Sequence, residues 1–124
     1  LEGWPGYPFL SFEAPAPLDT TFFAAQRALV AEGFELDFTE RASGLVNTRP
    51  RDIDGRTMFL SLVVDTTAGG GSRVWVAGYE PVRGGARRVN PAREDAWAAL
   101  RRATARVSER LGGTEPAEPD PPPD

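Results

Sequence analysis

The chain has 124 residues, of which 40% are hydrophobic and 26% charged, with a formal net charge of −4 at pH 7. This size and balance fit one globular domain with a single core. It contains no Cys, His or Lys, so all 14 basic residues are Arg. This excludes zinc sites of the usual kind, Ser–His and Cys–His nucleophiles, Schiff-base lysines and lysine-dependent phosphate loops. We expect no cofactor, no metal and no catalytic residue.

Residues 1–17 are predicted to form an extended arm that is rich in Pro and aromatic residues. Its four prolines exclude a central strand, although Phe9–Glu13 is compatible with a short edge strand. Trp4 and Tyr7 are costly to leave in water. We therefore expect these two rings to pack on the domain's own surface, or to reach a partner or a membrane interface.

The domain proper is predicted over residues 18–113 and begins with a helix. The apolar residues that share one face of this helix are Phe22, Ala25 and Leu29. Asp19 or Thr20 is the predicted N-cap, because a short polar side chain can accept hydrogen bonds from the first free N–H groups. Gly33 follows the last periodic residue and is expected to end the helix.

Four strand-like segments follow, joined by short connections that favour an antiparallel meander. They are Phe34–Thr39, Leu45–Arg49, Thr57–Asp65 and Arg73–Val82. In the first segment, Phe34, Leu36 and Phe38 alternate with polar residues, which predicts one buried and one solvated face. Asp54 and Gly55 predict a tight hairpin turn, because such turns require positive φ angles.

A long second helix is predicted near the C-terminus. Arg83–Val89 is expected to be a loop, with Asn90 as the following N-cap and Pro91 at the first helical position. The apolar side of the helix consists of Trp97, Leu100, Thr104, Val107 and Leu111. Gly112 is expected to end the helix, and residues 114–124, mostly Pro and acidic, are predicted to be disordered.

Together these elements predict an α+β fold in the order α-β-β-β-β-α. Both helices have one apolar side, so both should pack on the same face of a four-stranded antiparallel sheet. Phe9–Glu13 is the segment that would add an N-terminal edge strand. The longest apolar run, Met58–Val64, is interrupted by Ser61 and falls far short of the roughly 20 residues of a membrane span.

Acidic residues on the strands are the first candidates for chemistry. Glu35 and Asp37 point the same way from the first strand, and Glu80 lies on the fourth, so the three could serve in acid–base catalysis. We favour a solvated face for all three, as is usual on an alternating strand. Likewise, Gly69–Gly71 is interpreted as a hairpin loop and Asp52–Gly55 as a polar turn, not as phosphate or calcium sites.

Arginine is concentrated in residues 83–111, which contain eight Arg and three acids. The members predicted to be exposed are Arg87, Arg88, Arg102, Arg106 and Arg110. The last three lie at i, i+4 and i+8, opposite the apolar side of the second helix. This surface is either a solvated helix face or a site for an anionic ligand or acidic partner. The acidic net charge argues against nucleic acid.

One stretch is similar to a known family. Residues 22–34 are FFAAQRALVAEGF, and residues 41–48 are RASGLVNT. A helix ending A-L-x-x-x-G-F, a strand, and then R-x-S-G-L-V-x-T resembles small bacterial envelope lipoproteins of the NlpB/DapX type. The resemblance covers residues 18–111 and implies a helix-grip domain, in which an antiparallel sheet holds a long C-terminal helix. It also implies a scaffold or binding role without catalytic residues, and a lipidated Cys upstream of Leu1.

We therefore expect a non-catalytic bacterial envelope domain, periplasmic or associated with the outer membrane. It would be the soluble part of a lipoprotein and would bind another envelope protein or act as a scaffold. The alternatives are a module for an anionic ligand or nucleic acid that uses the Arg-rich helix, and a small hydrolase that uses the strand carboxylates. The residues expected to contact a partner are Trp4, Tyr7, Arg87, Arg88, Arg102, Arg106 and Arg110.

Overall fold

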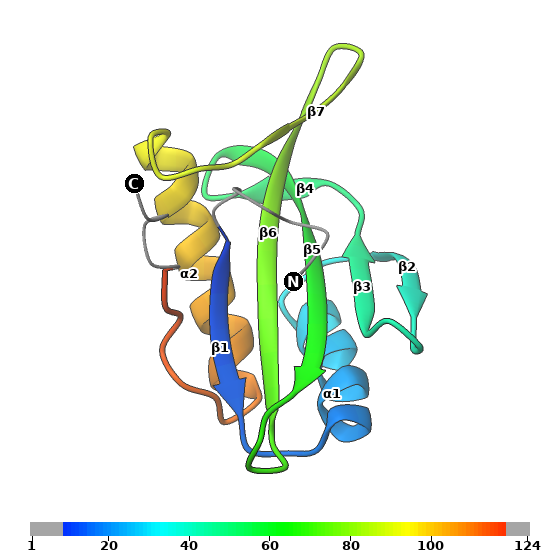
Figure 1. Cartoon of the computed structure of the whole chain (residues 1–124). Coiled ribbons are helices and arrows are strands. Elements are labelled where there is room, and N and C mark those ends of the chain that lie inside the picture. The colour runs from blue at the N-terminus through cyan, green and yellow to red at the C-terminus, as the bar shows by residue number, and fades with distance from the viewer. Residues whose placement is uncertain (1–8, 119–124) are drawn as a thin grey trace, which may run out of the picture.

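The computed structural model describes residues 9–118, so Trp4 and Tyr7 lie outside the described residues. Within that range the elements are β1 (Leu10–Ala14), α1 (Leu18–Ala31), β2 (Leu36–Glu40), β3 (Leu45–Thr48), β4 (Arg51–Ile53), β5 (Arg56–Thr66), β6 (Ser72–Val82), β7 (Gly85–Arg88) and α2 (Glu94–Arg110). The predicted α+β class is confirmed (Figure 1). The predicted number of strands is wrong, because the described sheet has seven and not four.

The sheet is built around β5 and β6, two antiparallel strands of 11 residues each. The strand order is β1-β6-β5-β3-β2, with β4 paired to β5 and β7 paired to β6. All of these pairs are antiparallel, as the short connections predict. The N-terminal edge strand suggested at Phe9–Glu13 exists as β1, and it pairs with β6.

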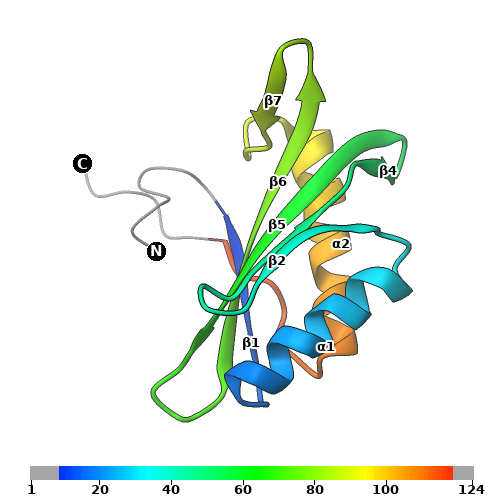
Figure 2. The ribbon, with the colours of Figure 1, turned by 90° about the vertical axis from the view of Figure 1, so that its right-hand side faces the viewer.

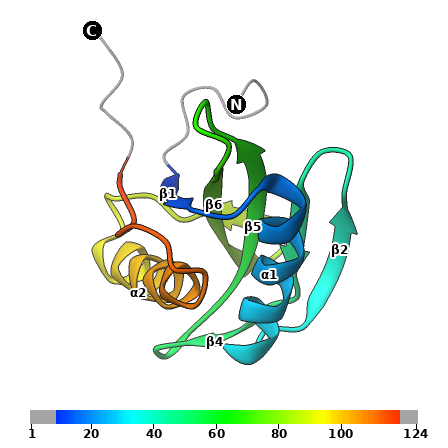
Figure 3. The same cartoon turned by 90° about the horizontal axis from the view of Figure 1, so that it is seen from below.

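Both helices lie on one face of the sheet, as expected from their apolar sides (Figures 2 and 3). The core lies between the helices and the side chains of β5 and β6 that point towards them. Its fully buried members include Leu29, Met58, Leu60, Leu62, Val74, Val76 and Leu100. No helix among residues 9–118 is both long enough and apolar enough to cross a membrane.

The predicted starts of both helices are wrong. In α1 the N-cap is Pro17, because Thr21 N already donates to Pro17 O at 2.9 Å. In α2 the first helical residue is Glu94. Asn90 caps a separate turn that precedes the helix, where its Oδ1 accepts a hydrogen bond from Ala92 N at 2.9 Å. A short polar residue therefore marks a turn just as readily as a helix start.

The predicted alternation along the first strand also fails. Phe34 is 3% exposed, whereas Phe38 is 48% exposed. The pairing of β2 with β3 shifts register between Leu36 and Phe38, which is a β-bulge. One extra residue reverses the side to which later side chains point, so Phe38 lies on the sheet face opposite the helices.

The segment predicted as a loop at Arg83–Val89 instead contains β7. Val82 and Gly85 are paired, so Arg83 and Gly84 form a two-residue turn, with Gly84 at φ 86. The hairpin predicted at Asp54 and Gly55 is confirmed, because these residues have φ 53 and φ 86 and join β4 to β5.

Residues 114–118, predicted as the start of a disordered tail, run beside β1. Thr114 N donates to Glu13 O at 2.9 Å, and Ala117 N donates to Ser11 O at 2.7 Å. Further along, Glu118 Oε1 accepts from Trp97 Nε1 at 2.5 Å. This segment therefore covers the free edge of β1. The prediction of disorder stays untested for residues 119–124, which are outside the described range.

Gly44 lies where β3 approaches the end of β5, and its O accepts a hydrogen bond from Val64 N at 2.9 Å. Gly44 has φ 71, and a Cβ added there would lie 2.2 Å from Val64 O. Gly55 also has a positive φ, but a Cβ there would meet nothing within 4 Å. Substitution of Gly55 would therefore cause backbone strain alone, whereas substitution of Gly44 would cause strain and a steric clash.

We expect Gly44→Ala to lower the free energy of unfolding by about 2–4 kcal/mol, because it adds a clash with the β5 backbone to about 1 kcal/mol of left-handed strain. Gly55→Ala is the matched control, and it should lose only the strain component. Urea unfolding followed by circular dichroism measures both values. Equal losses in the two variants would contradict the close approach at Gly44.

Candidate functional site

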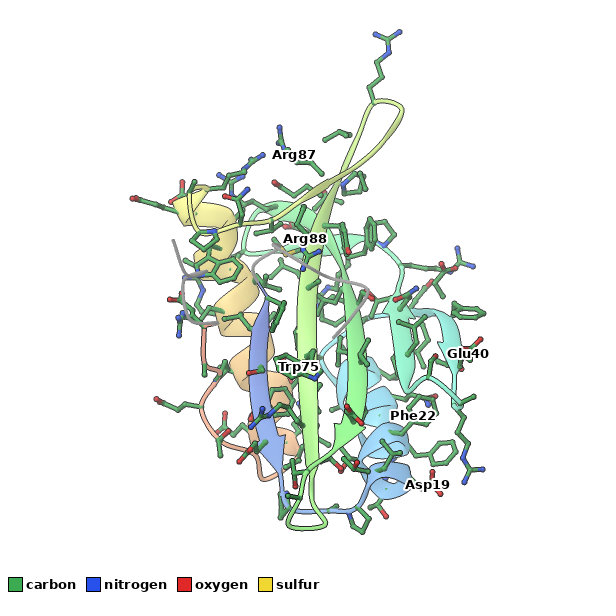
Figure 4. All side chains as sticks on the ribbon, in the orientation of Figure 1. Asp19, Phe22, Glu40, Trp75, Arg87 and Arg88 are labelled. Carbon is green, nitrogen blue, oxygen red and sulfur yellow. The ribbon has the colours of Figure 1, made fainter. Side chains whose placement is uncertain are left out.

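The sheet face opposite the helices is not covered by any helix or strand of residues 9–118, and we call it the outer face (Figures 1 and 2). Successive side chains of a strand point to opposite sides of a sheet, so the outer face is formed by every second residue. Its central members are Phe59, Ser61 and Val63 of β5, Trp75, Ala77 and Tyr79 of β6, and Leu45 and Asn47 of β3. Figure 4 looks onto this face, with Trp75 labelled.

Strand pairing aligns these side chains in rows across the sheet. In the first row, Trp75 is opposite Val63, which is opposite Leu45. The ring of Phe9 meets Trp75 edge to face, with the ring centroids 4.8 Å apart. The guanidinium carbon of Arg73 lies 5.5 Å from the centroid of the Trp75 ring. This row thus presents a large half-buried ring with an apolar neighbour on each side.

The second aromatic row lies further along β5 and β6. Phe59 is opposite Tyr79, and their rings stack with centroids 5.2 Å apart at an interplanar angle of 14°. Arg88 of β7 is opposite Tyr79 on its other side. The guanidinium carbon of Arg88 lies 5.4 Å from the centroid of the Tyr79 ring. The side chains of Phe59, Tyr79 and Arg88 are all partly exposed.

Small and polar residues separate the two aromatic rows. Ala77 is opposite Ser61, which is opposite Asn47. Ala77 has no exposed surface. Asn47 Oδ1 is buried without a hydrogen-bond partner. A buried carbonyl oxygen without a donor costs roughly 1–3 kcal/mol, so the middle row contains an acceptor that a bound N–H group would satisfy.

The apolar centre of the outer face has a polar border next to the β5–β6 turn. A shallow hollow of about 590 Å³ adjoins Trp75 there, and it is lined by Glu13, Asp65 and Arg73 among others. Arg73 Nη2 and Glu13 Oε1 form an ion pair at 2.6 Å. An apolar centre with a polar border is the usual anatomy of a protein–protein interface.

The structure does not gather the predicted arginines into one surface. Arg87 and Arg88 are adjacent in β7 and so point to opposite sides of the sheet (Figure 4). Arg87 Nη2 lies 3.7 Å from Glu80 Oε1. On α2, Arg102 Nε lies 2.7 Å from Asp54 Oδ2. Each of these side chains therefore has a partner within the described part of the chain.

Arg106 and Arg110 follow Arg102 at i+4 and i+8 on α2, and both are paired with Glu32 at the end of α1. Their Nε atoms lie 2.9 Å and 2.6 Å from its two carboxylate oxygens. The Glu32 side chain is only 14% exposed. The hydrogen bond from Arg110 lowers the pKa of Glu32 most, against the raising effect of burial. Arg51 Nη1 also donates to the Glu32 backbone oxygen.

The three acidic candidates lie apart, because β5 and β3 separate β6 from β2. Glu35 and Asp37 are exposed, as predicted. Glu35 Oε2 lies 4.0 Å from Arg49 Nε, and Asp37 Oδ1 lies 3.7 Å from Arg49 Nη2. The prediction of a solvated Glu80 is wrong, because it is 8% exposed and surrounded by arginines. Its closest ion pair is with Arg93, at 3.0 Å. Within residues 9–118 no three Asp or Glu side chains are grouped as a metal site requires.

The outer face was not among the predicted site residues. The available signal was the composition of the two long strands, where Phe59, Val63 and Trp75 add apolar groups to the side that does not face the helices. A strand that is apolar on both sides indicates contacts on both sides. Strand register, which the sequence does not show, is what arranges these residues into rows.

No protein-family model matches the chain, and no curated protein matches it. The function is therefore inferred from the geometry of the outer face and the chemistry of its residues.

The Glu32 cluster generates a prediction about stability. At pH 7, Glu32→Gln should lower the free energy of unfolding by about 1–2 kcal/mol, allowing for solvent screening at the exposed arginines. The folded-state pKa lies below the ordinary value of 4.5. The stabilisation is therefore complete above that value and is lost as the pH falls through the folded pKa.

Urea unfolding at pH 7 and across the acid range measures this effect. In Glu32→Gln the acid loss of stability should be smaller than in the parent chain. Glu109→Gln, an exposed substitution on α2, is the control and should follow the parent at every pH. If the two variants have the same acid dependence, Glu32 does not have the proposed role.

Proposed function

We propose that this chain is a non-catalytic protein-binding module that holds its partner on the outer face of the sheet. It would work in the bacterial envelope as the soluble part of a lipoprotein. The observation that supports binding is the pair of aromatic rows, centred on Trp75 and Tyr79, on a face without a described helix. Partly exposed rings of this kind are typical anchors in protein interfaces.

The outer face is better suited to a partner than the edges of the sheet. At one edge, β2 contains a bulge and the acids Asp37 and Glu40, features that disfavour the addition of another strand. At the other edge, residues 114–118 already pair with β1. A partner that packs side chains between the aromatic rows would bury apolar area without competing for these edges.

A protein partner is also favoured over an anionic ligand. The arginines of α2 that would bind an anion are paired with Glu32 and Asp54. Releasing these three arginines would leave the carboxylates of Glu32 and Asp54 without their partners. The hydrolase alternative is disfavoured by the separation of Glu80 from Glu35 and Asp37, because β5 and β3 lie between β6 and β2.

The envelope location rests on the resemblance of residues 22–48 to small envelope lipoproteins. These residues comprise most of α1, the strands β2 and β3, and the turn between them that contains Gly44. The long C-terminal helix α2 packs on an antiparallel sheet, which is compatible with the helix-grip arrangement that the resemblance implies. Gly33 and Gly44 have local roles of their own, with φ 94 and φ 71.

Photo-crosslinking in the source cells tests the binding surface. A benzophenone amino acid in place of Phe59 should give a discrete intermolecular adduct, because the ring lies on the outer face. The matched control replaces Phe23, an α1 ring that is 44% exposed on the other side of the sheet. Adding Tyr79→Ser should reduce the Phe59 adduct several-fold. An adduct at Phe23 with none at Phe59 would reject the outer face.

Cell fractionation tests the location. We expect the native, untagged protein to be found with the membranes, and its intact mass to include a lipidated Cys upstream of Leu1. The measurement is mass spectrometry of the membrane and soluble fractions. A cytoplasmic protein without lipid would overturn the envelope proposal and leave the binding proposal standing.

A further inference from the structure

The last part of β6 projects from the body of the domain as a two-stranded hairpin with β7. β6 pairs with β5 only as far as Tyr79, and from there to Val82 it pairs with β7 alone among the described strands. The hairpin extends well past the ends of both helices (Figures 1 and 2). A two-stranded hairpin is marginally stable in water by itself, so its order depends on contacts at its base.

The base of the hairpin is fixed to the domain. Glu80 is 8% exposed, and its Oε1 lies 3.0 Å from Arg93 Nη2 and 3.7 Å from Arg87 Nη2. Directly after β7, Val89 has no exposed surface, and its N donates to Gly78 O at 2.9 Å. The hairpin therefore leaves the domain from a defined position in the core.

The outer end of the hairpin makes no comparable contacts. Residues 81–87 are all exposed. Val82 is one of the large hydrophobic side chains that the fold leaves exposed, at 39%. Among residues 9–118, the side chain of Arg83 has no ion-pair or hydrogen-bond partner. An unpaired cation beside an exposed apolar side chain, on an anchored hairpin, indicates a ligand outside the chain.

The hairpin end of the sheet also has an excess of positive charge. Between Glu80 and Glu94 the chain contains four Arg and no acidic residue, although its net charge is −4. The single carboxylate of Glu80 is shared by Arg56, Arg87 and Arg93. This differs from α2, whose arginines are matched by carboxylates of α1 and of the β4–β5 turn. The excess charge attracts an anionic surface.

We propose that the tip of this hairpin contacts the headgroup layer of an anionic lipid bilayer. Arg83 would pair with lipid phosphates, which are strong acceptors for a guanidinium group. The apolar side chains of Pro81, Val82 and Ala86 would enter the boundary between headgroups and acyl chains. The tip combines the two features that such a boundary rewards, cationic groups and small apolar groups.

A bilayer suits the tip better than a protein or a nucleic acid does. Gly84 and Gly85 have no side chains, so the tip has no large ring to fill a pocket of a protein partner. A fluid headgroup layer requires no such shape complementarity. Nucleic acid would offer phosphates to Arg83 but no apolar layer for Val82.

The biological role of this contact rests on the proposed envelope location. A lipid chain together with a basic patch forms a two-signal membrane attachment. The hairpin would be the second signal and would orient the domain on the bilayer. Because it continues the direction of β6, the bilayer would lie at the end of the sheet and leave the outer face open to its partner (Figure 2).

Co-sedimentation of the full 124-residue chain with vesicles tests the contact. We expect binding to vesicles that contain phosphatidylglycerol, weaker binding as salt is added, and little binding to phosphatidylcholine alone. Arg83→Gln should lower the partition coefficient about fivefold, and Val82→Ser several-fold. Arg27→Gln, which removes an exposed arginine of α1, is the matched control and should bind like the parent chain.

A fluorescent label locates the contact, and the absence of native Cys makes single labelling direct. A nitrobenzoxadiazole group on Val82→Cys should shift its emission to the blue on phosphatidylglycerol vesicles. The same label on Ala68→Cys, exposed in the β5–β6 turn at the other end of the sheet, should show no shift.

Three results would overturn the proposal: no binding to the anionic vesicles, unchanged binding by Arg83→Gln, or an equal shift from the two labels. A protein adduct from a benzophenone amino acid at Val82, without vesicle binding, would replace the bilayer with a protein. The Phe59 adduct is a separate readout. Its loss with retained vesicle binding rejects the outer-face partner alone, and the reverse result rejects the bilayer contact alone.

Discussion

The antiparallel pairing of β5 with β6 is the constraint on which the rest of the structure depends. Eight residue pairs, from Phe59 with Tyr79 to Thr66 with Ser72, set the register of the two longest strands. The same pairing places one set of side chains in the core and the other set in rows on the outer face. A slip of one residue would exchange the two sets, so burial of the core side also determines the geometry of the candidate site.

The ionic contacts hold the helices in place on that sheet. Glu32 joins the end of α1 to Arg106 and Arg110 of α2, while Asp54 joins the β4–β5 turn to Arg102. A carboxylate that is mostly buried requires such partners, and two arginines at i and i+4 supply them from one helix face. An arginine stripe that resembles an anion site in the sequence thus acts within the fold as a connection between elements.

The outer face combines aromatic rings with a polar acceptor that lacks a hydrogen-bond partner. At the β1 side of this face, the ring of Phe9 packs on Trp75. The middle row, with Ala77 and the unpartnered Asn47 Oδ1, lies directly beyond it. A polar acceptor buried between apolar rows is costly to leave unsatisfied, which favours an occupant with backbone donors.

The sequence by itself determined the class of fold, the apolar sides of both helices, the alternation along β5 and the Asp54–Gly55 turn. These depend on periodicity and on local φ preferences, which neighbouring residues define. Only the tertiary structure decided the bulge that turns Phe38 outward, the pairing of β7, the burial of Glu80 and the partners of the α2 arginines. Each of these depends on contacts between residues far apart in the chain, and local sequence patterns do not contain that information.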